Sequence, residues 1–268
     1  EIGCEVSIQI IVTQGDRIQD LSFDKLEGKG FFTKEIEQAL LNGEVDLAVH
    51  SHKDLETTQP AGLHIAAVSY REDASELLLM RKSAFDSNEP WNLKKNAIIG
   101  TSSARRKAQI LAQRPDLEIK ELRGNVPTRI DKLRQGQYDA ILLARAGVLR
   151  LALDLSDLET VVLDPTSFIP APAQGVLGLQ TRVDDHVSTE ILQKLHHADV
   201  AKRIGLERSV LRQMDGGCQL PLGVYCTGNQ VHVSFSSSST SAATNSVYDY
   251  VDGNEMQLAQ HIVQDLKK

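Results

Sequence analysis

The sequence predicts an α/β protein that ends in a smaller α+β unit. Strand-like and helix-like runs alternate between residues 33 and 153, a pattern typical of sheets whose strands are joined by helices. Two short segments, residues 70–73 and 170–173, resemble crossings between units, the second because its prolines stiffen the chain. After Arg182 the pattern changes to a helix-rich stretch and then to alternating residues around 231–233.

Length and composition are those of a globular protein with two or three compact units. The chain has 268 residues, of which 41% are hydrophobic and 24% charged, so disorder and a coiled coil are excluded. No apolar run reaches the roughly 18 residues of a membrane span. The cysteines Cys4, Cys218 and Cys226 are too few and too scattered for a disulfide framework or a zinc site, which indicates a reducing compartment.

The first elements are predicted in chain order from their periodicity. Residues 6–12 alternate like a strand, and no basic and then apolar leader precedes them, so no signal peptide is expected. Residues 33–42 are predicted to form a helix that ends at Gly43. Val45, Leu47 and Val49 then alternate as a strand that ends in the polar cluster of residues 50–54. Open α/β sheets bind ligands at such carboxyl ends.

The following segment repeats the strand and helix pattern, which predicts parallel strands with helical crossovers. The predicted strands are residues 97–99, 117–122 and 140–143, and the helices are residues 104–113, 126–134 and 146–153. If both crossings are correct, the chain leaves its first domain near residue 70 and returns near residue 175. The predicted domains are residues 1–69 with 175–193, residues 75–169, and residues 198–268. Residues 234–246 are predicted to form a loop or a frayed edge.

Arginines concentrate in the middle of an acidic protein. The net charge is −7, but residues 105–150 carry +6, so the remainder carries −13. The turn of residues 100–103 leads into a helix that begins with Arg105 and Arg106, which predicts an anion site. Arg123, Arg129 and Arg150 follow neighbouring strands, so five guanidiniums could bind a ligand with several carboxylates. The alternative is a solvated face of ion-paired arginines, which we favour for Arg134 and Arg145.

The polar cluster after the first-domain strand offers a second set of reactive groups. Asp54 facing an arginine-lined cleft would stay ionised, and could hold N–H donors or stabilise a developing cation. Lys53 could contact an anion beside it. The alternative for both is an exposed ion pair in a loop. His50 and His52 have no acidic or cysteine partner at metal-ligand spacing, so hydrogen-bonded histidines at a strand end are favoured.

One cysteine lies in a setting that favours reactivity. Cys218 follows two glycines, where the backbone can present a thiolate nucleophile with little hindrance. The alternative is a structural cysteine. Cys4 and Cys226 lie in strand-like surroundings and are predicted to be small core residues.

Six motifs in order and spacing resemble the hydroxymethylbilane synthase family, also called porphobilinogen deaminase. They are KGFFTKEIEQALLNGEVDLAVHSHKDL, GTSSARRKAQILAQRPDL, LRGNVPTRIDKL, YDAILLARAGVLRL, PAPAQG and GGCQLPLG, and the resemblance covers residues 13–225. It implies three domains, two of them α/β domains resembling periplasmic binding proteins and the third a small α+β domain that carries a cysteine.

The resemblance also implies a reaction. The family condenses four porphobilinogen molecules head to tail onto a dipyrromethane cofactor, each with loss of ammonia, and releases hydroxymethylbilane by hydrolysis. By resemblance Cys218 anchors that cofactor through a thioether, and Asp54 stabilises the cationic azafulvene that forms as ammonia leaves. No metal is implied.

Each pyrrole ring carries acetate and propionate arms, so the family's cleft supplies cations and hydrogen-bond donors. The positions that match it are Asp16, Lys25, Ser51, Lys53, Asp54, Thr101, Ser103, Arg105, Arg106, Arg123, Arg129, Arg150, Gln174 and Gly175. Lys29 and Phe32 match a loop that covers the site. The sequence departs from the pattern in lacking the opening GTRxSxLAxxQ motif, in carrying His52 where methionine is frequent, and after Ser234.

The sequence therefore predicts a cytoplasmic, monomeric transferase that binds neither nucleic acid nor membrane. A two-lobed α/β protein that binds a polycarboxylate or oxyanion without chemistry is the alternative, and it predicts an unmodified Cys218 thiol. A nucleic-acid binder is disfavoured, because the arginine segment has few aromatic residues and the net charge is negative.

Overall fold

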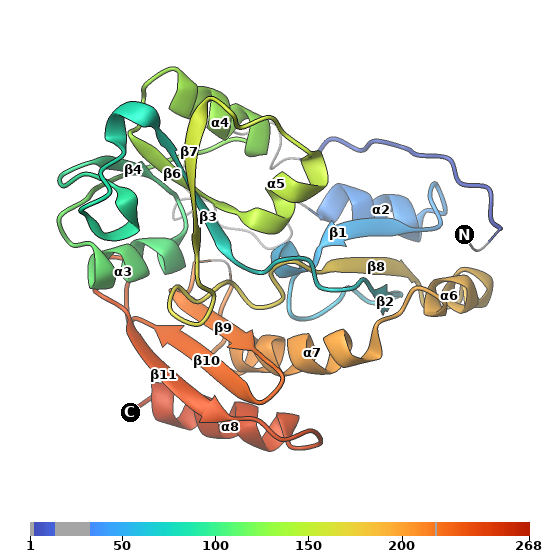
Figure 1. Cartoon of the computed structure of the whole chain (residues 1–268). Helices are drawn as coiled ribbons and strands as arrows, with labels where there is room; N and C mark the ends of the chain where they lie inside the picture. The colour runs from blue at the N-terminus through green and yellow to red at the C-terminus, as the bar shows by residue number, and fades with distance from the viewer. Residues whose placement is uncertain (1–2, 14–32, 218) are drawn as a thin grey trace.

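The computed structural model describes residues 3–13, 33–217 and 219–268. In these residues the strands form three sheets, each with its own helices (Figure 1). The predicted fold class, an α/β protein with a small α+β unit at its end, is confirmed by this arrangement.

The first sheet has three strands in the order β1-β8-β2, and both pairings are antiparallel. Its strands and helices come from the two ends of a long stretch of chain: β1 (Ala48–Ser51), β2 (Leu63–Val68), β8 (Leu177–Arg182), α2 (Lys34–Leu41) and α6 (His186–Gln193). Leu40 of α2 packs on Ala48 and Leu63 in a buried cluster. The helix predicted at residues 33–42 is thus confirmed, whereas the strand predicted from Val45, Leu47 and Val49 lies further along the chain, at Ala48–Ser51.

The second sheet has five strands in the order β5-β4-β6-β3-β7. They are β3 (Glu76–Arg81), β4 (Ile98–Gly100), β5 (Glu118–Lys120), β6 (Ala140–Ala144) and β7 (Leu158–Leu163). Only β4 pairs in parallel, with β5 and β6, whereas β3 is antiparallel to both β6 and β7. The prediction of parallel sheets is therefore wrong outside this β-α-β core. β3, which the chain reaches directly from the first sheet, lies between β6 and β7 and runs antiparallel to both.

Three helices cover the second sheet: α3 (Ala104–Gln113), α4 (Val126–Arg134) and α5 (Arg145–Leu151). The first two begin at capping residues, because Ser103 accepts a hydrogen bond from Arg106 N and Asn125 accepts one from Thr128 N. β3 is buried on both faces: Leu78 and Met80 belong to one core cluster, and Leu77 and Leu79 to the other. α3 and α4 have the bounds that the sequence predicts.

The chain passes from the first sheet to the second between Val68 and Glu76, and returns between Leu163 and Leu177. The two connections run side by side, since Glu72 N donates a hydrogen bond to Gly175 O at 2.9 Å. The segments singled out as crossings lie in these connections. The exact domain limits stay predictions.

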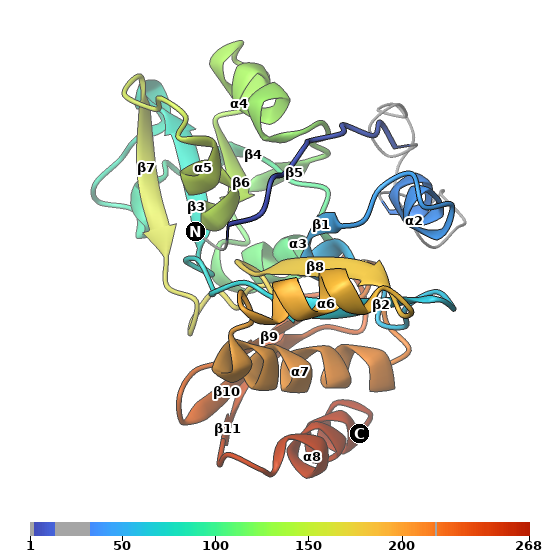
Figure 2. The ribbon, with the colours of Figure 1, turned by 90° about the vertical axis from the view of Figure 1, so that its right-hand side faces the viewer.

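The third unit is a three-stranded antiparallel sheet in the order β11-β10-β9, covered by two helices. Its elements are α7 (Ala198–Gln213), β9 (Leu222–Cys226), β10 (Gln230–Phe235), β11 (Thr244–Asp249) and α8 (Glu255–Leu266). Figure 2 shows α7 between the first and third sheets. Val200 and Ile204 pack beside β2, whereas Leu206 and Val210 belong to the core of the third unit, so α7 joins the two.

Three sequence predictions about individual segments need correction or refinement. Residues 6–12 form no strand and are mostly exposed, since no neighbouring strand pairs with them (Figure 1). Cys4 is exposed and not a core residue, although Cys226 is buried as predicted. The loop predicted at residues 234–246 is shorter, because β10 and β11 extend into its two ends. None of the helices among the described residues is long and apolar enough to span a membrane.

Candidate active site

The polar cluster after β1 forms a single turn of 3-10 helix, His52–Asp54. Its first residue is fixed to the returning crossing, because His52 N donates to Val176 O at 2.9 Å. Asp54 is exposed, and Lys53 Nζ donates to Gln174 Oε1 at 3.4 Å. Burial lowers the pKa of Lys53, and the charge of Asp54 opposes that effect. The turn therefore presents a cation and a carboxylate side by side.

The predicted anion turn after β4 is built from hydroxyl groups that brace the backbone. Thr101 is buried, and its Oγ1 accepts a hydrogen bond from Ser103 N at 3.3 Å. Ser102 Oγ donates to Leu122 O and accepts from Leu122 N, which ties the turn to the end of the next strand. Ser103 caps α3. These bonds hold the first turn of α3 against the carboxyl ends of β4 and β5.

Glu76 binds the two arginines that begin α3. Its Oε1 accepts from Arg105 Nη2 at 2.6 Å and its Oε2 from Arg106 Nη2 at 2.7 Å. Both guanidiniums also donate to main-chain carbonyls, those of Ile169 and Leu142 respectively. All three side chains are buried. Protein groups alone thus hold Arg105 and Arg106 in place, without a ligand.

The electrostatics of this cluster extend to the polar turn of the first sheet. Burial would raise the pKa of Glu76, but the charges of Arg106, Arg105 and Lys53 lower it to about 2. Burial lowers the pKa of Arg105. Lys53 therefore interacts with residues of the second sheet although its backbone belongs to the first.

Arg129 and Asp54 interact across the two sheets. Arg129 lies on α4, where its Nε donates to Gly124 O at 2.6 Å. Burial and the repulsion from Arg106 lower its pKa to about 10, whereas the charge of Asp54 acts in the opposite direction. Arg123 adds to the repulsion. The structure thus brings Lys53, Asp54, Arg105, Arg106, Arg123 and Arg129 into one electrostatic cluster around Glu76, which we call the arginine cluster.

Gln174 and Gly175 lie in the returning crossing and contact both sheets. Gln174 is fully buried, and its Nε2 donates to Ala74 O at 2.8 Å while its Oε1 accepts from Lys53. Arg150, on α5, donates to Gly175 O at 2.7 Å. Ser51, by contrast, is exposed at the end of β1. The predicted crossing residues therefore connect the polar turn to the second sheet.

Five predicted site residues lie outside the residues that the structure describes. They are Asp16, Lys25, Lys29, Phe32 and the proposed cofactor anchor Cys218. The two arginines for which a surface role was favoured do pair with carboxylates: Arg134 Nη2 with Asp157 at 2.7 Å and Arg145 Nη1 with Asp73 at 2.6 Å.

Sequence reasoning missed the acids that organise this site. Glu76 stands directly before four apolar residues in a buried strand, and a carboxylate in that setting needs a cationic partner. Glu207, fully buried on α7, binds Arg71 at 2.6 Å and accepts from Ala173 N and Cys226 N. The sequence signal for Glu207 was weaker than that for Glu76, because α7 contains several other charged residues.

The histidines of the polar turn differ from each other. His50 hydrogen-bonds to Gln180 at 3.0 Å, as expected for a strand-end histidine. His52 is 7% exposed, and its Nδ1 has no hydrogen-bond partner in the described part of the chain, contrary to that expectation. Burial and the charge of Arg208 lower the pKa of His52 to about 4. No group of three or more metal-ligating side chains occurs in the described part of the chain.

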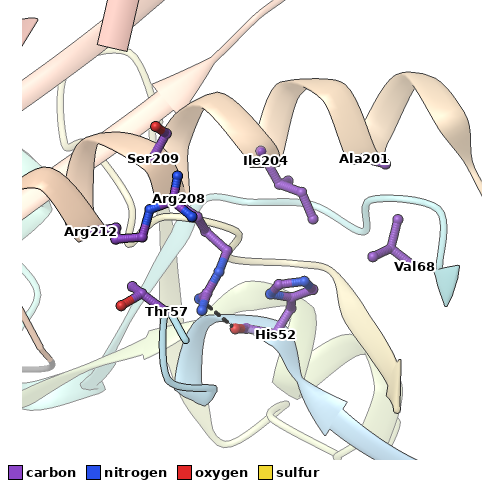
Figure 3. Close-up of a pocket in the computed structure, with 9 residues that line it drawn as sticks. His52, Thr57, Val68, Ala201, Ile204, Arg208, Ser209 and Arg212 are labelled. Carbon is purple, nitrogen blue, oxygen red and sulfur yellow. Dashed lines mark hydrogen bonds between the residues drawn. The ribbon is translucent and has the colours of Figure 1, made fainter. Parts of the chain in front are cut away.

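A pocket of about 240 Å³ lies on the other side of the polar turn, between it and α7 (Figure 3). His52 and Thr57 line it from the first sheet, and Ile204, Arg208 and Arg212 line it from α7. None of its lining residues belongs to the arginine cluster. We therefore place the candidate active site at the cluster and not in this pocket.

Two family models cover most of the chain. The model described as "Porphobilinogen deaminase, dipyromethane cofactor binding domain" matches residues 1–190, and the model described as "Porphobilinogen deaminase, C-terminal domain" matches residues 201–266. The porphobilinogen deaminase of Oceanobacillus iheyensis is 45% identical over 229 residues, which cover 85% of this chain and 72% of that protein. The porphobilinogen deaminase of Shouchella clausii is 46% identical over 223 residues, 83% of this chain and 70% of that protein.

The fold and the cationic site define a multidomain α/β protein for a polyanionic ligand. The chain belongs to the porphobilinogen deaminase family, as its motifs indicated. This membership supports the enzyme over the non-catalytic binding protein. Among solved structures, the periplasmic VFT2 domain of Bordetella pertussis BvgS overlaps 65% of this chain and 72% of its own, with 15% identity and a TM-score of 0.37.

Proposed function

We propose that this protein condenses four porphobilinogen molecules head to tail, with loss of ammonia, onto a covalently bound dipyrromethane and releases hydroxymethylbilane. The observation that carries the proposal is the meeting of two sheets at one site. Lys53 and Asp54 from the first interact electrostatically with Arg105, Arg106 and Arg129 from the second. The family match supports the reaction.

The cationic cluster fits the dipyrromethane group. A dipyrromethane with acetate and propionate arms carries several carboxylates, and guanidinium groups bind each carboxylate in a bidentate manner. Arg106 Nε is buried and has no hydrogen-bond partner among the described residues, so it offers a donor for a ligand carboxylate. We propose that Lys53, Arg105, Arg106, Arg123 and Arg129 hold these arms, and that Cys218 forms the thioether. When bound, the group would supply the pyrrole carbon to which the first new ring is joined.

Asp54 is proposed as the catalytic residue. Positive charge develops on the substrate ring as ammonia leaves, and a carboxylate fixed beside that ring stabilises the transition state more than the neutral ground state. Asp54 is exposed at the end of a turn fixed by His52, so a substrate can reach it. A ring N–H group can donate to its carboxylate.

The other predicted site residues have supporting roles in this proposal. Ser51, Thr101 and Ser103 supply hydroxyl or backbone donors near the arms, and Gln174, Gly175 and Arg150 fix the crossing beside Lys53. Asp16 and Lys25 would add to the cleft, and Lys29 and Phe32 would belong to a covering loop, as the resemblance implies.

We also propose that the protein acts as a cytoplasmic monomer without nucleic acid or membrane. Cys226 is a buried free thiol, which is compatible with a reducing compartment. The net charge of −7 disfavours nucleic acid.

The test of the proposed function is turnover of porphobilinogen by the purified chain. We expect consumption of porphobilinogen with release of ammonia, and a linear tetrapyrrole that closes to a porphyrinogen on standing. Binding of porphobilinogen without ammonia release would contradict the proposal and would support the binding-protein alternative.

A further inference from the structure

Arg208 of α7 reaches across to the polar turn and binds its backbone. Its Nη1 donates to His52 O at 3.0 Å (Figure 3). Its Nη2 donates to Leu55 O at 3.0 Å and to Glu56 O at 2.6 Å. These carbonyls stand on both sides of Lys53 and Asp54. One guanidinium therefore fixes the main chain before and after the two residues proposed to act on the ligand.

His52 N anchors the start of the turn to Val176 O, but the turn's own main-chain hydrogen bond is long. The segment is a single 3-10 turn, in which Leu55 N donates to His52 O at 3.3 Å. The carbonyls of Leu55 and Glu56 follow the turn, where a helical segment needs donors from elsewhere, whereas His52 O also accepts from Leu55 N. Arg208 donates to all three carbonyls from one planar group, which leaves the turn less freedom to rotate than three separate donors would.

The backbone of α7 at Arg208 is fixed by the contacts of the preceding residue. The preceding residue, Glu207, is fully buried and binds Arg71 of the outgoing crossing, Ala173 N of the returning crossing and Cys226 N of β9. α7 is thereby joined to both crossings and to the third sheet at one point. A shift of α7 would move the guanidinium of Arg208 and the turn that it binds.

We propose that Arg208 is a positioning residue, which sets the orientation of Lys53 and Asp54 toward the arginine cluster from the far side of the turn. The inference rests on the proposed function, because it assigns to Arg208 a role in the action of Asp54. Arg208 contacts the turn's main chain and acts through it. Arg208 should therefore affect the turnover rate, because misplacement of a catalytic group by about 1 Å can cost about 100-fold in rate.

The test compares Arg208→Gln with the parent chain and with Arg203→Gln. Arg203 lies on the same helix, and its Nε donates to Asp199 O within that helix at 3.2 Å, so it serves as the matched control. We expect Arg208→Gln to lower kcat by about 10-fold to 100-fold with KM changed by less than about threefold, while covalent cofactor loading persists. Arg203→Gln should match the parent.

A structural readout separates positioning from general stability. Hydrogen exchange of a peptide spanning residues 52–58 should be faster in Arg208→Gln, with the core of the third unit unchanged. Arg208→Lys, which keeps the charge but lacks the planar fork, should restore part of kcat and part of the protection. It also serves as the test variant if Arg208→Gln does not fold.

The outcomes distinguish this inference from the proposed function. Unchanged kcat in Arg208→Gln, or a loss of kcat with exchange accelerated throughout the molecule, would overturn the positioning role while the parent still makes the tetrapyrrole. If the parent itself releases no ammonia, the proposed function fails. Exchange in residues 52–58 then still decides whether Arg208 holds the turn.

Discussion

Glu76 Oε2 lies 2.7 Å from Arg106 Nη2, in the interior between β3 and the first turn of α3. Both side chains are buried, so neither charge is screened by water. The carboxylate fixes the guanidinium in one orientation and, through its other oxygen, does the same for Arg105. The cationic cluster is thus formed before the ligand arrives, and little side-chain ordering remains for binding.

Glu76→Gln should destabilise the fold strongly. The amide leaves two buried guanidiniums without their counter-charge, and breaking a buried ion pair on one side costs about 3–5 kcal/mol. Equilibrium denaturation measures the free energy of unfolding. Glu118→Gln is the control, because Glu118 is exposed and pairs with an equally exposed Lys120. Equal effects of the two substitutions would contradict the role of Glu76.

Asp54→Asn should keep the covalent cofactor and lose most turnover. The amide has the size of the carboxylate but carries no charge to stabilise the developing cation, and loss of one such group costs about 100-fold to 1,000-fold in kcat. Single-turnover kinetics with porphobilinogen measure the chemical step. Asp46→Asn, at an exposed carboxylate that pairs with Arg182, is the control. Near-normal turnover of Asp54→Asn would rule out the proposed role.

Acid should weaken the fold partly through His52. Burial lowers its pKa from 6.5 to about 4 in the folded protein, so between these values the unfolded chain binds a proton that the folded chain does not. The free energy of unfolding should therefore decrease as the pH falls from about 6.5 to about 4. At pH 4 this one group lowers the free energy of unfolding by roughly 3 kcal/mol.

His52→Met isolates that contribution, because methionine is a flexible apolar side chain that does not titrate. As the pH falls from about 6.5 to about 4, the free energy of unfolding of the variant should increase relative to that of the parent. Comparing the two proteins removes the effect of other acid-sensitive groups such as His50, whose pKa burial also lowers. Parallel stability curves would refute the assignment.

Gly175→Ala should destabilise the crossing between the sheets. Gly175 has a φ of +90°, and a Cβ there would lie 2.3 Å from Glu72 O, so the two crossings would have to separate. The expected cost is about 1–3 kcal/mol. Gly205→Ala, in α7 with open space around its Cβ, should instead stabilise by about 0.5–1 kcal/mol. Thermal unfolding compares them, and a harmless Gly175→Ala would mean that the crossing adapts.

Local signals predicted the elements that carry the site. Ser103 and Asn125 are good helix caps, so the starts of α3 and α4 were predicted correctly, and with them the placement of Arg105, Arg106 and Arg129. The polar turn after β1 was evident because polar residues follow a short apolar run. In each case the information lies within a few neighbouring residues.

What the sequence did not predict depends on contacts between distant segments. Residues 6–12 have the pattern of a strand, but a strand forms only where a neighbour supplies hydrogen bonds. The antiparallel pairing of β3 with β7 joins distant segments of the chain, and no local signal encodes it. Glu76 and Arg208 act on residues about 30 and 156 positions away respectively, so their roles emerge only in the folded structure.

The measurement that tests the central claim most directly is the intact mass of the denatured protein, before and after incubation with porphobilinogen, beside a Cys218→Ser variant. We predict a mass excess of two pyrrole units that survives denaturation and is absent from the variant. Incubation should then add a series of species, each heavier by one porphobilinogen less ammonia. An unmodified mass that stays unmodified after incubation would contradict the covalent chain-building mechanism.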